Sequence, residues 1–279
     1  MTPSRTPIVR VRLDPADADL AGAELFELGA SGIEERDATT LERAEPGCVE
    51  LIAHFGGEAE AAAARSALEG RYDAALEHIE GEDWRERWKE FFHPTRVGVR
   101  LVVRPPWEPF DAAPGDVVIT IDPGQAFGTG THETTRLVLG ELERIGCRGS
   151  VLDVGCGSGI LGIAAMLLGA DRAVAVDVDP LAIRAAHDNA AANGVTLDAS
   201  VTPLASLPGR HELVVANIRS PILIPMAPLL SERTGGRLVL SGLLVEEEDE
   251  VRAVFDARLE LDRRSAEGEW LALTYRARP

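Results

Sequence analysis

The stretch "VLDVGCGSGILG", residues 151–162, decides the fold because it joins an apolar run to an alanine-rich helix pattern. Gly155, Gly157 and Gly159 have the spacing of a tight strand-to-helix turn, in which the backbone can approach a ligand closely. A dinucleotide fingerprint would need glycine where the chain has Ile160, and the Lys-Ser/Thr pair of a P-loop is missing. The turn therefore predicts a ligand-binding α/β domain and disfavours NAD and ATP as ligands.

Two acidic residues flank this turn. Asp153 precedes it, where a carboxylate can hold turn amides or an ammonium group of a ligand. Asp177 lies 22 residues after Gly155, at the end of the next apolar run, where an acid can accept hydrogen bonds from ribose hydroxyls. The predicted ligand has a ribose and a cationic end, and it has no pyrophosphate.

Strand and helix patterns alternate from the glycine turn onwards. This alternation predicts a doubly wound, mainly parallel sheet with helices on both faces. The ending differs, since "RLELDRRSAEGEWLALTYR" (258–276) reads as two strands around a short turn. We expect that an antiparallel hairpin closes the edge of the sheet, and that an acidic helix begins at Glu246.

The first 80 residues have a pattern of their own, β-α-β-β-α-β, which predicts a small ferredoxin-like α+β domain. Asp14 and Pro15 predict the start of its first helix, as N-cap and first helical residue. Residues 1–80 contain 17 Asp or Glu and 7 Arg, a formal charge of about 7 − 17 = −10. This charge favours a basic protein as the partner of the domain.

A connector is predicted between this domain and the rest. "EDWRERWKEFFHP" (82–94) sets Trp84, Trp88 and Phe91 on one face of a short helix that Pro94 ends. We expect three parts: the ferredoxin-like domain at 1–80, a connector helix at 81–95, and an α/β domain at 96–279.

Composition narrows the class of protein. The chain of 279 residues carries a formal net charge of −18, which disfavours direct nucleic acid binding. No apolar run approaches the length of a membrane span, and Cys48, Cys147 and Cys156 follow neither a metal-ligand nor a disulfide pattern. We expect a cytoplasmic monomer with no metal and no membrane contact.

The combination of "LDVGCGSG" and "VDVDP" resembles the S-adenosylmethionine loop of class I methyltransferases. With "WRERWKEFFHP", "DPGQAFGTGTHETT", "NAAANGV" and "VVANI", the chain resembles PrmA, the family of bacterial methyltransferases of ribosomal protein L11, over residues 82–217. The resemblance implies a seven-stranded methyltransferase domain and an N-terminal substrate-recognition domain. It implies methyl transfer from S-adenosylmethionine to lysine ε-amines of ribosomal protein L11, with the N-terminal α-amine as a further acceptor.

The resemblance also implies which residues form the site. Asn217 ends an apolar run, where an open α/β sheet places reacting groups, and we expect it to orient the attacking amine rather than act as a base. Its alternative role is to cap the following turn. The residues expected to hold the cofactor are Phe127, Gly128, Thr135, Asp153, Gly155, Gly157, Asp177 and Asn217.

Some positions leave alternatives open. Gln125, Glu133 and the pair Arg219-Ser220 depart from the family's pattern, and the pair is expected beside the methyl-transfer site. The enzyme could therefore act on another protein lysine or on a small amine, and a non-catalytic module that binds S-adenosylmethionine is a third reading. For His132 we favour a local hydrogen bond over a base, and for Cys156 a small turn residue over a nucleophile.

Overall fold

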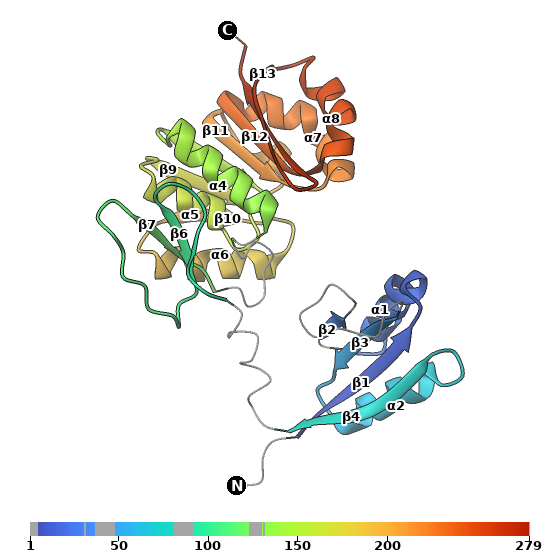
Figure 1. Cartoon of the computed structure of the whole chain (residues 1–279). Helices are drawn as coiled ribbons and strands as arrows, with labels where there is room; N and C mark the ends of the chain where they lie inside the picture. The colour runs from blue at the N-terminus through green and yellow to red at the C-terminus, as the bar shows by residue number, and fades with distance from the viewer. Residues whose placement is uncertain are drawn as a thin grey trace. The chain divides into compact units, whose positions relative to one another are not determined.

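The computed structural model describes residues 5–30, 32–36, 48–80, 92–122, 130 and 132–278. The chain divides between Phe91 and Phe92 into two compact units, which we describe separately (Figure 1). The division falls within the predicted connector, but Trp84, Trp88 and Phe91 lie outside the described residues. Within the described ranges, every helix is too short or too polar to cross a bilayer.

The first unit has the predicted β-α-β-β-α-β order. Its sheet has the strand order β2-β3-β1-β4, in which each neighbouring pair is antiparallel, as in ferredoxin-like domains. The elements are β1 (Arg5–Leu13), η1 (Pro15–Asp17), α1 (Ala18–Glu27), β2 (Gly32–Arg36), β3 (Val49–His54), α2 (Glu58–Leu68) and β4 (Asp73–Glu80).

The start of the first helix differs from the prediction. Pro15–Asp17 form one turn of 3-10 helix, in which the amide of Asp17 donates to the carbonyl of Asp14 at 2.9 Å. The α-helix begins only at Ala18, with Asp17 at its N-cap. A proline fits the first turn of either helix type, so it does not distinguish them.

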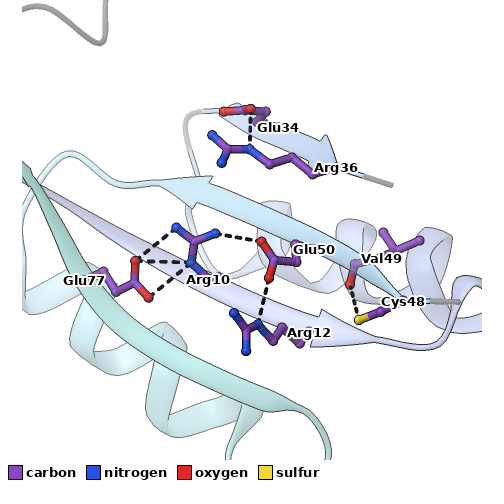
Figure 2. Close-up of polar contacts among 8 residues, drawn as sticks. All are labelled: Arg10, Arg12, Glu34, Arg36, Cys48, Val49, Glu50 and Glu77. Carbon is purple, nitrogen blue, oxygen red and sulfur yellow. Dashed lines mark hydrogen bonds and ion pairs between the residues drawn. The ribbon is translucent and has the colours of Figure 1, made fainter. Parts of the chain in front are cut away.

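Strand β1 shows how the first unit separates its core from its polar face. Val9, Val11 and Leu13 are buried in a cluster with residues of both helices. Arg10, which points the other way, donates to Glu50 at 2.7 Å and to Glu77 at 3.1 Å (Figure 2). This alternation follows from the two-residue period of a strand.

The second unit contains the predicted seven-stranded sheet, in the order β10-β9-β8-β11-β12-β14-β13. The first five strands are parallel, and β14 pairs antiparallel with both β12 and β13, so the predicted hairpin is confirmed. The strands are β8 (Ser150–Val154), β9 (Arg172–Val176), β10 (Leu197–Ser200), β11 (His211–Asn217), β12 (Thr234–Leu244), β13 (Glu260–Glu267) and β14 (Trp270–Arg276).

Helices cover both faces of this sheet (Figure 1). One buried cluster joins one face to α4 (Glu133–Ile145), α5 (Ile160–Leu167) and α6 (Pro180–Ala192). A second cluster joins the other face to α7 (Ser220–Arg233) and α8 (Glu248–Phe255). The central strands are buried on both faces, because successive residues such as Val214 and Val215 belong to different clusters.

The second unit also contains a small three-stranded sheet and a 3-10 turn that precedes its acidic helix. A three-stranded sheet of β5 (Thr95–Arg96), β6 (Leu101–Arg104) and β7 (Val117–Thr120) precedes in the chain the stretch "DPGQAFGTGTHETT" (122–135), which we call the first glycine loop. The acidic helix predicted from Glu246 begins two residues later, as α8 at Glu248: η4 (Val245–Glu247) comes first, and the Glu248 amide donates to the carbonyl of Val245 across this 3-10 turn.

Candidate active site

The glycine turn between β8 and α5 has the backbone conformation that its spacing predicts. Gly155, Gly157 and Gly159 have φ values of +70°, +51° and +78°, a region that disfavours other residues. The Gly155 amide donates to the carbonyl of Val176 at 2.8 Å, which fixes the turn against the end of β9. The turn therefore lies at the carboxyl ends of two adjacent parallel strands, where open α/β sheets bind ligands.

Close packing also favours glycine at position 155, because a side chain there would have no room. A Cβ atom at Gly155 would lie 2.9 Å from side-chain carbons of Ile218, the residue after Asn217. A Cβ atom at Gly242 would likewise lie 2.9 Å from the backbone of Ile218, whose amide donates to the carbonyl of Ser241 at 3.0 Å. Ile218 thus sits between two glycines, and this contact fixes the chain directly after Asn217.

Asp153 is the most deeply buried charged group of the site, with 0% of its surface exposed. One carboxylate oxygen accepts from the Gly162 amide at 3.0 Å, while Oδ1 has no hydrogen-bond partner among the described residues. Burial raises the pKa of Asp153 to about 7, and the neighbouring charge of Asp177 adds to this effect. An unpaired buried carboxylate oxygen is costly, and a ligand cation would satisfy it.

Asp177, at the end of β9, has different surroundings. One of its oxygens accepts from the Gly157 amide at 2.9 Å, and the other accepts from the Asp179 amide at 3.0 Å. A carboxylate has about four lone-pair positions, so two remain for hydroxyl donors. Asp177 therefore braces the glycine turn and can still accept hydrogen bonds from a ligand.

Asn217, the last residue of β11, contacts the first turn of α4. Its Nδ2 lies 3.2 Å from Oγ1 of Thr134 and 3.4 Å from Oγ1 of Thr135. Both threonines are buried, with 2% and 1% exposure. The structure thus brings together two of the predicted residues, Thr135 and Asn217, and adds Thr134, which the sequence analysis did not single out.

His132 fixes the direction of these hydrogen bonds. It is the N-cap of α4, and its Nδ1 accepts from the Thr134 amide at 3.3 Å. Because Nδ1 acts as an acceptor, we assign the 2.9 Å contact to the Thr134 hydroxyl donating to Nδ1. The hydroxyl oxygen then accepts from the Asn217 amide group, which leaves Oδ1 of Asn217 for another donor. His132 makes the local hydrogen bond that we favoured.

The C-terminal hairpin supports the same helix start. The rings of Trp270 and His132 pack edge to face with centroids 5.0 Å apart. Arg136 donates to Glu267 at 2.5 Å, and its guanidinium also lies 3.4 Å from Glu133. The departure at Glu133 therefore has a structural role, since its charge pairs with Arg136 in the first turn of α4.

Asn189 of α6 and Asn193, the C-cap residue of this helix, lie in the quoted stretch "NAAANGV" and connect the glycine turn to the segment before the first glycine loop. Asn189 donates to the carbonyl of Ser158 at 2.9 Å and accepts from the Asp122 amide at 2.9 Å. Asn193 accepts from the Thr120 amide at 2.8 Å and donates to its carbonyl at 2.6 Å. Their spacing of four residues, about one helical turn, is the sequence feature from which a shared role could have been predicted.

Phe127 and Gly128, which are expected to hold the cofactor, lie outside the described residues, and so does Gln125 of the same first glycine loop.

The surroundings of Cys156 disfavour its alternative role as a nucleophile. Cys156 is 5% exposed, and burial raises the pKa of its thiol. A thiol in such surroundings is a poor nucleophile, which supports the role of a small turn residue.

Comparisons with known proteins identify the family of the chain. The family model for ribosomal protein L11 methyltransferase (PrmA) matches residues 8–278. A protein of Geobacter metallireducens named ribosomal protein L11 methyltransferase is 52% identical over 199 residues, which are 70% of this chain and 67% of that protein. A protein of the same name from Sorangium cellulosum is 41% identical over 307 residues, covering 98% and 96% of the two chains.

A solved structure supports the same assignment. The ribosomal protein L11 methylase of Lactobacillus delbrueckii subsp. bulgaricus is 32% identical, with a TM-score of 0.64 over 67% of this chain and 100% of that chain. The chain therefore belongs to the PrmA family of ribosomal protein L11 methyltransferases, class I enzymes that use S-adenosylmethionine.

Proposed function

We propose that this protein methylates lysine ε-amines, and also the N-terminal α-amine, of ribosomal protein L11. The names of its relatives motivate the choice of substrate. The observation that carries the chemistry is the orientation of Asn217. Its amide group is turned towards Thr134 and Thr135, so its Oδ1 faces away from them as an acceptor at the carboxyl edge of the sheet.

The residues of the glycine turn fit S-adenosylmethionine. Oδ1 of Asp153 is buried without a partner among the described residues, which suits the ammonium group of the cofactor. Asp177 keeps two lone-pair positions for ribose hydroxyls, and the turn at Gly155 and Gly157 lets the backbone come close. In this proposal Thr135 and Asn217 also line the cofactor site, together with Phe127 and Gly128.

The chain itself must prepare the acceptor amine. When bound, the cofactor supplies a methyl group that its sulfonium already activates. A lysine amine has a pKa of about 10.4 in water, so only about one in 10³ is neutral near pH 7. Exclusion of water by the bound substrate at the half-buried end of β11 would lower that pKa, and Oδ1 of Asn217 would accept an N–H bond and direct the lone pair. Orientation is the role we assign to Asn217.

We assign substrate recognition to residues 1–80, with residues 81–95 as the connector and residues 96–279 as the methyltransferase domain. The charge of about −10 in the first part suits a basic ribosomal protein. On the polar face of the sheet the acids are paired, since Arg10 binds Glu50 and Glu77 while Arg12 binds Glu50 (Figure 2). Acids that could attract a basic substrate therefore lie elsewhere, for example in the first turn of α2, where the Glu60 side chain is exposed.

Intact-mass measurement tests the proposal. The purified enzyme is incubated with S-adenosylmethionine and unmodified ribosomal protein L11, and the product is then mapped by peptide mass. We expect the mass to rise by whole methyl units on amines. An unchanged mass, with cofactor binding confirmed by calorimetry, would reject ribosomal protein L11 as the substrate.

A second candidate substrate is another protein lysine or a small amine. Arg219 favours this candidate, because it is an exposed cation two residues after Asn217 and would repel a lysine-rich partner. Labelled methyl groups that appear on a species other than ribosomal protein L11 in a cell lysate would support it. Calorimetry that shows cofactor binding without any methyl transfer would instead favour a non-catalytic module.

A further inference from the structure

We propose that Ser220 and Glu247 are positioning residues for Asn217. Their hydrogen bond holds the chain that follows β11 in place, and with it the Asn217 side chain that orients the acceptor amine. This inference rests on the proposed role of Asn217. Ser220 is the first residue of α7 and Glu247 is the last residue of η4. The contact therefore joins the segments that follow β11 and β12.

The contact is short and shielded. Oγ of Ser220 donates to Oε1 of Glu247 at 2.5 Å, and Ser220 is 3% exposed. Bonds from a hydroxyl to an ionised carboxylate are among the shortest and strongest in proteins. Desolvation opposes ionisation of Glu247, but the bonds from Ser220 and from the Leu244 amide, together with the charge of Arg219, outweigh it and hold the pKa of this carboxyl below its usual value.

The second oxygen of Glu247 completes the connection. Oε2 accepts from the amide of Leu244, the last residue of β12, at 2.8 Å. One carboxylate thus ties the start of α7 to the end of β12. A hydroxyl group at position 220 is required for this connection, since alanine would leave Oε1 of Glu247 without its donor.

These contacts matter for Asn217 because of the short distance along the chain. Only two residues, Ile218 and Arg219, lie between Asn217 and Ser220, and Ile218 is already held between two glycines. The Ser220 contact fixes the other end of this turn. Release of that end would let the Asn217 backbone shift, and a misplacement of about 1 Å at a reacting centre can cost about 10²-fold in rate.

Four variants test the inference. Ser220→Ala removes the bond, Ser220→Thr keeps a hydroxyl, and Glu247→Gln leaves an amide group that can satisfy only one of the two donors. Glu246→Gln is the matched control, because it removes the same charge from the exposed neighbouring position. Folding of each variant is checked by thermal melting, and cofactor affinity is measured by calorimetry.

We expect Ser220→Ala and Glu247→Gln to lower kcat on ribosomal protein L11 by about tenfold, with KM and cofactor affinity within about twofold of wild type. The double variant should be no slower than the slower single variant, because both remove one contact. Ser220→Thr should recover most of kcat, and Glu246→Gln should behave as wild type. A folded Ser220→Ala variant with wild-type kcat would overturn the inference.

A readout without turnover separates this inference from the proposed function. The side-chain amide signal of Asn217 in nitrogen-edited NMR spectra reports its surroundings directly. We expect the signal to shift or broaden in Ser220→Ala and to stay in place in Glu246→Gln. An unmoved signal in Ser220→Ala overturns the inference, even if ribosomal protein L11 is the substrate; a wild-type enzyme inactive on that protein rejects only the proposed substrate.

Discussion

The carboxyl ends of β8 and β9 present two aspartates to the same glycine turn, but their surroundings are opposite. Asp153 is completely buried and has one oxygen without a partner among the described residues. Asp177 is partly exposed, and both of its oxygens accept from backbone amides. The comparison shows that Asp177 builds the turn itself, whereas Asp153 leaves one buried oxygen unpaired, which we propose binds a positive group of a ligand.

The largest effect is expected from Asp177→Ala. Loss of two hydrogen bonds to an ionised group, each worth about 1.5–3 kcal/mol, should lower the free energy of unfolding by about 3 kcal/mol or more. Cofactor affinity should fall with it, because Gly157 loses its anchor. Denaturant unfolding and calorimetry provide the measurements. A variant as stable as wild type would show that Asp177 does not brace the turn.

Asp153→Asn should separate binding from stability. We expect cofactor affinity to fall about tenfold or more, because the carboxylate charge is lost, without a loss of stability in the free protein at pH 8. Asp198→Asn, on the exposed side of β10, is the control for removal of one charge. If Asp153→Asn binds the cofactor as tightly as wild type does, Asp153 has no role in holding it.

The raised pKa of Asp153 predicts how the stability of the free protein depends on pH. The pKa of Asp153 is raised from 3.8 to about 7, so between these values the folded protein holds a proton that the unfolded chain releases. Stability of the free protein should therefore fall as pH rises through this window, by up to about 1.4 kcal/mol per pH unit from this group. Thermal melting between pH 5 and pH 8 should show a steeper fall for wild type than for Asp153→Asn. Parallel curves would contradict the assignment.

The smallest effect is expected from Cys156→Ala. Cys156 lies in the same turn as the two acids, but burial raises the pKa of its thiol and leaves it inert. We expect kcat to stay within about twofold of wild type. A loss of activity like that of a catalytic residue would show that the thiol takes part in the reaction.

Local patterns were sufficient to predict much of the fold. The spacing of Gly155, Gly157 and Gly159 predicted a tight strand-to-helix turn, and the structure has one, with positive φ at all three glycines. Alternation of strand and helix patterns predicted the parallel sheet, and the pattern of residues 258–276 predicted its closing hairpin. These features depend on neighbouring residues, whose periods and turn chemistry are written in the sequence. The helix starts were less exact, since 3-10 turns at Pro15–Asp17 and Val245–Glu247 precede the two α-helices, and the pattern does not distinguish these turns from α-helix.

Long-range contacts within the site could not be read from the sequence. Asn189 meets Ser158 across 31 positions and Asp122 across 67, and Asn217 meets Thr134 across 83. Such pairs exist only after the sheet has formed, because tertiary packing brings their elements together. The difference between Asp153 and Asp177 is of the same kind, since burial and backbone donors define it rather than residue type.

The orientation of Asn217 is the central claim, and single-turnover methyl transfer tests it most directly. Wild type and Asn217→Ala are mixed with ribosomal protein L11 at saturating S-adenosylmethionine, so that weaker cofactor binding does not limit the rate. We predict that Asn217→Ala transfers methyl groups about 100-fold more slowly, because the acceptor amine loses the oxygen that directs it. A rate equal to that of wild type would contradict the account.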